Sequence, residues 1–301
     1  MQPVPTTFDA HTFFTKFLGD TTPQRRDELN AIIAKYNIRF VLDEVSPGIE
    51  FWADPTSKQI NVPRRCLFRI KANALAYYST VDSLLAKKYG KADSGTDGRI
   101  HKASELLTWA VRTDVATFLN DKSSFSLGTV PKDIEGLYIG CLKTDQLDVG
   151  EEIFHMAVAW VLHHELAHLR LQHTSPSVKI EYEADQAAID WLLKVDALTE
   201  ADRIARYFGI ATGLGWLSAL NVYVGPGSGK THPPAGQRFV NGLEYMTKEL
   251  GDEAELPWAI CQMVLLLHAQ NAGFPVEPKH MAGSFKEIAA NLLQVIEKAK
   301  P

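Results

Sequence analysis

Cysteine is scarce in this sequence, and its few positions form no pair. The 301 residues include three cysteines, Cys66, Cys141 and Cys261. An odd and scattered set provides neither a disulfide framework nor a CxxC metal site, and it fits a reducing compartment. We therefore expect all three to act as small hydrophobic residues of the core.

A strong excess of either charge is also absent. The chain has 31 basic and 36 acidic residues, a formal net charge of −5 and a pI of about 6.1. Nucleic acid binding usually needs a basic surface, so nucleic acid is not expected as a partner. A hydrophobic content of 46% with 22% charged residues predicts a soluble, globular protein.

Long apolar runs are lacking as well. Residues 1–7 contain no basic stretch followed by an apolar one, so no signal peptide is expected. The longest uncharged stretch, Phe208 to Pro226, contains several glycines and polar residues such as Thr212. It predicts a buried helix followed by a strand or loop, without stable membrane insertion. Membrane contact of residues 208–224 stays open at this point, and we expect a cytoplasmic protein.

One motif stands out against this background. Residues 164–168 read HELAH. They lie in a segment from Glu151 to Ser175 that contains neither glycine nor proline and whose residues favour a helix. Residues four apart share a helix face, so His164 and His168 can direct two imidazoles at one metal ion. Glu165 can reach a water beside that ion. This is the arrangement of zinc hydrolases, with two ligands and a general base; the alternative is a helix with two structural histidines.

A catalytic zinc usually has a third protein ligand, and the next expected helix offers two. Glu181 and Glu183 are about 200° apart on a helix, so only one can face the metal. Asp185 follows Glu181 by one turn and can accept a hydrogen bond from a ligand histidine. We therefore prefer Glu181, with Asp185 behind it, and keep Glu183 as the alternative.

Two further histidines flank the motif. His173 lies five residues after His168, and it should point away from His164 if the metal helix continues to about His173. His163 lies beside the ligand face and is expected to make local hydrogen bonds. Neither is expected to bind the metal.

Three short strands are expected before the motif, at residues 38–42, 49–53 and 59–62. The turns between them predict an antiparallel meander. In zinc peptidases a small sheet of this kind lies above the metal helix, and its edge strand can bind an extended peptide by strand addition. We expect Ile60, Asn61 and Val62 to bind substrate in this way; a purely structural sheet is the alternative.

His232 and Arg238 are candidates for later steps of peptide hydrolysis. A tetrahedral intermediate carries negative charge on the former carbonyl oxygen, and a nearby imidazole can stabilise that charge. We assign His232 to this role. Arg238 is expected either to bind substrate or to fix Asp185 or Glu181. The alternative is a helix start after Pro233 and Pro234 with a surface arginine.

Residues 225–231 resemble a phosphate-binding loop in sequence. The pattern needs glycine at position 224, where this chain has Val224, and the loop should open a helix toward the phosphate. Pro233 and Pro234 follow at once instead. A loop beside the active-site cleft is the preferred interpretation, and a nucleotide-dependent enzyme is the weaker one.

Helical patterns fill most of the remaining chain, and three helices finish it at about residues 234–249, 256–270 and 284–299. The expected fold is α+β and predominantly helical, with a zincin-like metallopeptidase core, a small antiparallel sheet and C-terminal helices. We divide it into residues 1–125, with the N-terminal helices and the meander, and residues 126–301, with the HExxH helical region. One continuous domain is the alternative.

Taken together, the motifs over roughly residues 150–240 resemble those of known peptidases. HExxH, a following E-x-x-x-D from Glu181 to Asp185, and a Thr-His-Pro-Pro segment with Arg238 resemble the zinc peptidases related to HtpX and the CAAX prenyl proteases. These are gluzincins, in which two histidines and one glutamate bind zinc. The length, the mid-chain motif and the absence of clear membrane helices look closer to the phage-exclusion peptidase Lit family. That resemblance implies a cytoplasmic bacterial endopeptidase of phage defence that cleaves a translation factor such as elongation factor Tu.

The expected function is zinc-dependent hydrolysis of a peptide bond in a protein substrate. One Zn²⁺ per chain is held by His164, His168 and Glu181, while Glu165 takes a proton from the attacking water and passes it to the leaving amine. A cytosolic protease needs restraint, and an activating peptide or another regulatory partner is one way to provide it. The alternative is a zinc-binding regulatory or interaction protein without proteolytic turnover.

Overall fold

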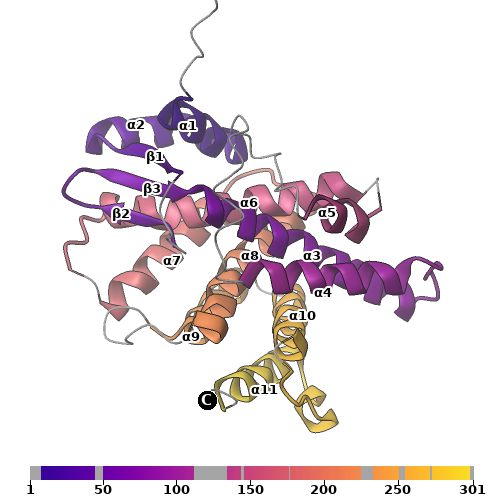
Figure 1. The fold of residues 1–301 in the computed structure, drawn as a ribbon. Coiled ribbons are helices and arrows are strands. Elements are labelled where there is room, and N and C mark those ends of the chain that lie inside the picture. Colours follow the sequence, from indigo (N-terminus) through magenta and orange to yellow (C-terminus); the bar gives the residue numbers. More distant parts are fainter. Residues whose placement is uncertain are drawn as a thin grey trace, which may run out of the picture.

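The computed structural model is mostly helical, with one small sheet on one side (Figure 1). It describes residues 8–44, 50–111, 134–143, 146–175, 177–224, 233–250, 255–271 and 273–298. The α-helices are α1 (Ala10–Thr21), α2 (Arg26–Tyr36), α3 (Arg64–Lys88), α4 (Thr96–Val111), α5 (Glu135–Cys141), α6 (Leu147–Arg170), α7 (Val178–Leu193), α8 (Glu200–Val224), α9 (Ala235–Leu250), α10 (Glu255–Asn271) and α11 (Phe285–Lys298). Short 3-10 helices are η1 (Pro23–Arg25) and η5 (Pro278–Met281), and the strands are β1 (Arg39–Asp43), β2 (Trp52–Asp54) and β3 (Gln59–Pro63).

Local sequence signals account for several of these boundaries. The Asp9 side chain accepts a hydrogen bond from the backbone N–H of Thr12 and so caps the start of α1. Helix α2 ends at Tyr36, and the next residue, Asn37, has a φ of 52° in the left-handed region that asparagine tolerates. Predominantly helical character with a small sheet is as expected, and so are the three C-terminal helices.

The order of the strands differs from the expected meander. The sheet runs β1-β3-β2; β2 and β3 form an antiparallel hairpin, whereas β1 pairs with β3 in parallel. The turn after Asp54 closes the hairpin, because the Asp54 carboxylate accepts hydrogen bonds from the Thr56 N–H and the Ser57 hydroxyl. β2 therefore lies on one side of β3, and β1 lies on the other side.

This order corrects the position that we expected for the substrate strand. Ile60, Asn61 and Val62 lie in the central strand, which has a neighbour on each side, so they form no edge. The side chains of Ile60 and Val62 are fully buried in the hydrophobic core. The strand that contacts α6 from the edge of the sheet is β2.

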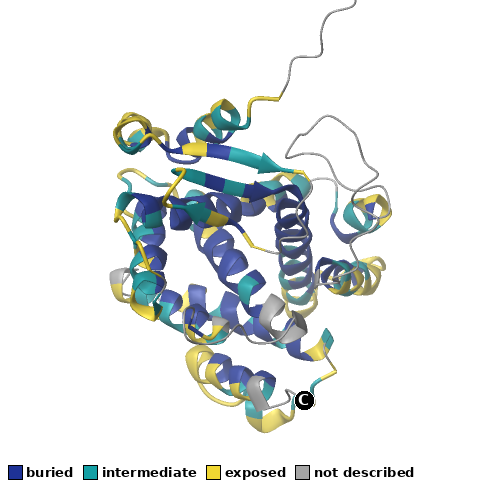
Figure 2. Ribbon diagram, turned by 60° about the vertical axis from the view of Figure 1, so that its left-hand side comes forward, coloured by how far each residue is buried: buried dark blue, intermediate teal, exposed yellow. Residues whose placement is uncertain are grey.

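Helix α6 lies in the interior, between α3, α7 and α8, and is buried over most of its length (Figure 2). The glycines of the uncharged stretch make this packing close. A Cβ atom at Gly209 of α8 would lie 2.3 Å from the Cβ of Met156, and one at Gly213 would lie 2.5 Å from the Trp160 ring. Helix packing on α6 therefore explains the glycine content of α8.

The uncharged stretch was predicted as a helix followed by a strand or loop, and the structure gives one helix through Val224. None of the helices in the described ranges combines the length and the apolarity that crossing a membrane requires. One hydrophobic core includes side chains from both halves of the chain, since α3 packs against α6 and α8.

Candidate metal centre

Helices α6 and α7 bring together the three residues that we expected to bind a metal. His164 and His168 lie one turn apart on α6, and Glu181 lies in the first turn of α7. The chain reverses between the helices, and Ser177 caps α7 by accepting a hydrogen bond from the N–H of Ile180. His164 and Glu181 are buried, and His168 is partly buried.

The spacing of the donor atoms fits a tetrahedral ion. The Nε2 atoms of His164 and His168 are 3.0 Å apart. Glu181 places one carboxylate oxygen 3.5 Å from His164 Nε2 and the other 3.6 Å from His168 Nε2. Zinc bonds of roughly 2.0–2.1 Å in tetrahedral geometry separate two ligand atoms by about 3.3 Å. One ligand atom from each of the three residues lies within 4.8 Å of the other two, so the cluster is compatible with a zinc ion.

Asp185 holds the first histidine from behind, as expected from the E-x-x-x-D spacing. Its Oδ1 lies 2.9 Å from Nδ1 of His164, which leaves Nε2 of that ring facing Glu181 and His168. An imidazole that donates its other N–H to a carboxylate is fixed in orientation and becomes a stronger metal ligand.

Arg238 contributes two charge-assisted hydrogen bonds to the same carboxylate. Its Nε donates to one oxygen of Asp185 over 3.0 Å, and its NH2 group donates to the other over 2.7 Å. The NH1 group lies 3.3 Å from Glu181. All three side chains are buried, so the guanidinium offsets two carboxylates that could not otherwise stay charged there. Of the two roles expected for Arg238, the geometry fits fixing Asp185 and Glu181.

The second histidine has a different outer partner, which sequence reasoning missed. Helix α6 ends at Arg170, and Gln172 adopts a left-handed conformation with φ of 57°. This turns the chain back, so that Nδ1 of His173 lies 2.9 Å from Nδ1 of His168. The expectation that His173 points away was wrong because it assumed a continuous helix. Glu183, the alternative ligand, lies 3.4 Å from Nε2 of His173 and outside the three-residue cluster.

Glu165 is buried beside the cluster, and the backbone of Ala53 from the sheet lies near its carboxyl. Burial raises the pKa of its carboxyl to about 7, although the positive charge of His164 and the nearby backbone of Ala53 lower it in part. A carboxyl group whose pKa lies near neutral pH is suited to accept and release a proton. Ala53 lies in β2, so the edge strand contacts the expected general base directly.

The two ligand histidines hold protons differently. Burial alone would lower the pKa of His164, but hydrogen bonds with Asp185 and Glu181 raise it to about 9. Burial lowers the pKa of His168 to about 3, and the positive charge of His164 adds to the effect. The cluster therefore attracts one positive charge, which a proton or a metal ion can supply.

His163 has another role than the one expected. Its ring stacks on Trp191 at a centroid distance of 4.9 Å, and neither ring nitrogen has a hydrogen-bond partner among the described residues. It packs rather than making local hydrogen bonds. His232 and the glycine-rich residues 225–231 lie outside the described residues, so their expected roles stay predictions.

Comparison with known proteins agrees with the motifs. The family model described as Peptidase U49 matches residues 70–261, which include α6, α7 and Arg238 but not the sheet. The chain is 29% identical over 224 residues to the cell death peptidase of Escherichia coli K12, and the match covers 70% of each chain. No solved structure matches. The expected resemblance to the Lit peptidase family is confirmed.

Proposed function

Because the chain belongs to the peptidase U49 family, we propose that it is a zinc-dependent endopeptidase with one metal ion held by His164, His168 and Glu181. The observation that carries this proposal is the donor-atom spacing of 3.0–3.6 Å, together with the buried Glu165 next to it in α6. The donor set, two imidazoles and one carboxylate, is common at catalytic zinc sites.

The protein groups divide the chemistry between them. A bound zinc ion would polarise the scissile carbonyl and make a water molecule more acidic. Glu165 accepts the proton of the attacking water and then delivers it to the leaving amine. Asp185 and Arg238 keep His164 in one orientation throughout. His232 is proposed to stabilise the negative charge that develops on the carbonyl oxygen.

We place the substrate along β2 instead of β3. Among the described strands β2 has a neighbour on one side only, and β2 contacts α6 and brings the backbone of Ala53 close to Glu165. An extended peptide that adds to this edge would run past the metal-binding face of α6. Trp52 is 40% exposed on the same strand and offers an apolar contact for a substrate side chain.

The relatives support a proposal for the substrate class. Resemblance to the phage-exclusion peptidases supports a cytoplasmic protease that attacks a protein of translation, and the name of the Escherichia coli relative supports a role in cell death. Identifying the proteins that the enzyme cleaves tests both points.

Metal content of the purified protein is the first test. Elemental analysis should give about one zinc per chain in the wild type and much less in His168→Ala and Glu181→Ala. Glu183→Gln is the matched control, since it changes the same residue type two positions away and should retain zinc at saturating metal. A wild type that binds no metal would overturn the proposal.

Glu165→Gln separates an enzyme from a zinc-binding regulatory protein. We expect the variant to bind zinc and to lose cleavage of proteins in a bacterial extract, scored by new N-termini that appear only with wild type. A biological effect that survives in Glu165→Gln would support the regulatory alternative instead.

A further inference from the structure

The face of α6 that carries the two ligand histidines continues one turn toward the start of the helix, to Trp160. Residues four apart share a helix face, so Trp160 precedes His164 on this face as His164 precedes His168. The centroids of the Trp160 and His164 rings are 5.9 Å apart, with the ring planes at 40°. Asp185 contacts His164 only at Nδ1, over 2.9 Å. The imidazole therefore has a polar partner at one edge and an aromatic neighbour from its own helix.

Helix α8 holds the indole of Trp160 in place. A Cβ atom at Gly213 would lie 2.5 Å from Cε3 of Trp160 and 3.0 Å from Cζ3, so the α8 backbone packs directly on the six-membered ring. Only 1% of Trp160 is exposed. A protein interior is densely packed, so the ring has little space to move into. The same indole thus contacts both the α8 backbone and the imidazole of His164.

Trp160 acts through its shape and not through hydrogen bonds. Its Nε1–H is buried and has no hydrogen-bond partner among the described residues. A buried N–H group without an acceptor is costly, and a phenylalanine at this position would avoid that cost. What the indole adds is a double ring, which is large enough to contact Gly213 and His164 at the same time.

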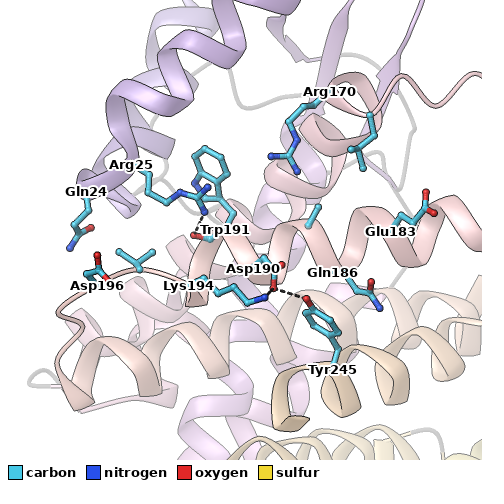
Figure 3. Close-up of a pocket in the computed structure, with 13 residues that line it drawn as sticks. Gln24, Arg25, Arg170, Glu183, Gln186, Asp190, Trp191, Lys194, Asp196 and Tyr245 are labelled. Atoms are coloured by element: carbon cyan, nitrogen blue, oxygen red, sulfur yellow. Dashed lines mark hydrogen bonds and ion pairs between the residues drawn. The ribbon is translucent and has the colours of Figure 1, made fainter. Parts of the chain in front are cut away.

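The neighbouring histidine of α6 packs on a tryptophan of a different kind. His163 stacks on Trp191, which lines a cavity of about 840 Å³ beside α7 and α9 (Figure 3). Trp191 donates its Nε1–H to the hydroxyl of Thr22 over 3.1 Å, and the Arg25 guanidinium lies 3.7 Å from its ring. A hydrogen bond and a cation therefore hold Trp191, and its histidine is not part of the metal cluster. Trp160 has no such bond, and the histidine it contacts is a ligand.

We propose that Trp160 is a positioning residue of the metal centre: the α8 backbone at Gly213 fixes the indole, and the indole fixes the orientation of the His164 imidazole. One hydrogen bond leaves a ring free to tilt about it, and a packed neighbour removes that freedom. A ligand that is already oriented avoids the cost of ordering when the ion binds. The role at the metal rests on the proposed function, whereas the link from Gly213 to His164 also exists in the metal-free protein.

Nuclear magnetic resonance of the metal-free full chain, isotope-labelled at histidine, tests this link. The Cε1–H signal of His164 is assigned by its loss in His164→Gln. It should shift in Gly213→Ala, because the added methyl group displaces the indole and a ring current depends on the position of the ring. Gly215→Ala is the matched control on the same helix, since its Cβ would lie 2.8 Å from Val264 of α10 instead. An unchanged His164 signal in Gly213→Ala, or an equal shift in both variants, overturns the proposal.

Cobalt(II) in place of zinc tests the consequence at the metal. Four-coordinate cobalt absorbs visible light more strongly than six-coordinate cobalt, so its bands report the ligand geometry. At saturating cobalt we expect weaker or shifted bands in Trp160→Leu, with Trp160→Phe between it and the wild type. Zinc affinity should fall about tenfold in Trp160→Leu. Trp258→Leu, at a buried tryptophan of α10, is the control: it should lose stability as well but keep the bands of the wild type.

The outcomes separate positioning from plain packing and from failure of the metal site. A Trp160→Leu protein that unfolds more easily but keeps the cobalt bands and the zinc affinity of the wild type would show that Trp160 only fills space. If Trp160→Leu does not fold, Trp160→Phe and Gly213→Ala provide the same comparison. A wild type that binds neither metal, while its His164 signal responds to Gly213→Ala, would overturn the proposed function but support the positioning of His164.

Discussion

The two faces of α7 use the same kinds of residue for different purposes. The inner face presents Glu181 and Asp185, which are buried with Arg238. The outer face presents Asp190, which forms a partly exposed ion pair with Lys194 just after the end of the helix. Burial makes a charge depend on its partners, whereas water replaces a lost partner at the surface. The comparison predicts that equal changes on the two faces will have very unequal effects.

The largest effect is expected for Arg238→Met. This substitution keeps most of the side-chain volume but removes the guanidinium from Asp185 and Glu181, and the His164 imidazolium alone then faces both buried carboxylates. Breaking a buried ion pair from one side costs about 3–5 kcal/mol of unfolding free energy. Urea unfolding of the metal-free protein at neutral pH measures it. A loss of unfolding free energy below about 1 kcal/mol would show that these buried ion pairs contribute no more than exposed ones.

A change of zinc affinity is expected for Asp185→Asn. The amide can still accept from Nδ1 of His164 but has no negative charge, so the imidazole becomes a weaker ligand. The expected loss is about 10–100-fold in zinc affinity, measured by competition with a chromophoric chelator. Asp190→Asn, on the outer face, is the control and should leave the affinity unchanged.

Acid sensitivity is expected from His163, a buried residue of α6 whose ring stacks on Trp191 of α7. Burial lowers its pKa from 6.5 to about 3. Below pH 6.5 the unfolded chain therefore takes up a proton that the folded chain refuses, and stability is lost as the pH falls. Between pH 7 and pH 5 this contributes about 2 kcal/mol.

His163→Phe should reduce the stability difference between these two pH values by that amount in the metal-free protein. His101→Phe, a change at an exposed histidine, provides the comparison. The same pH dependence in His163→Phe and wild type would show that this ring is not held neutral by the fold.

The smallest effect is expected for Lys194→Ala. The outer ion pair with Asp190 is 3.0 Å long, but both side chains are substantially exposed. We expect a loss of less than about 1 kcal/mol, and less still in high salt, from urea unfolding at two ionic strengths. A loss comparable with that of Arg238→Met would contradict the distinction between the faces.

Helix geometry explains which parts of the site were predictable. The i, i+4 spacing of His164 and His168, and the same spacing of Glu181 and Asp185, place each pair on one face whatever the rest of the chain does. The helical segments from 234 onward were equally clear from their apolar periodicity. Such features depend on residues close in sequence.

The missed features depend on single backbone conformations or on distant pairing. Nothing in the sequence around Gln172 signals a left-handed turn, yet that turn brings His173 to His168. The parallel pairing of β1 with β3 needs the chain to cross the sheet, which strand patterns alone do not show. The edge position was therefore assigned to the wrong strand.

The closeness of the Ala53 backbone to the carboxyl of Glu165 has a kinetic consequence. It ties the proposed base to the strand on which we place the substrate. A peptide that pairs well with β2 would steady this strand and, with it, the carboxylate that moves the proton. Binding energy gained along the peptide would then be expressed partly in the transition state. Substrates that differ only in residues away from the cleaved bond should in that case differ in kcat as well as in KM.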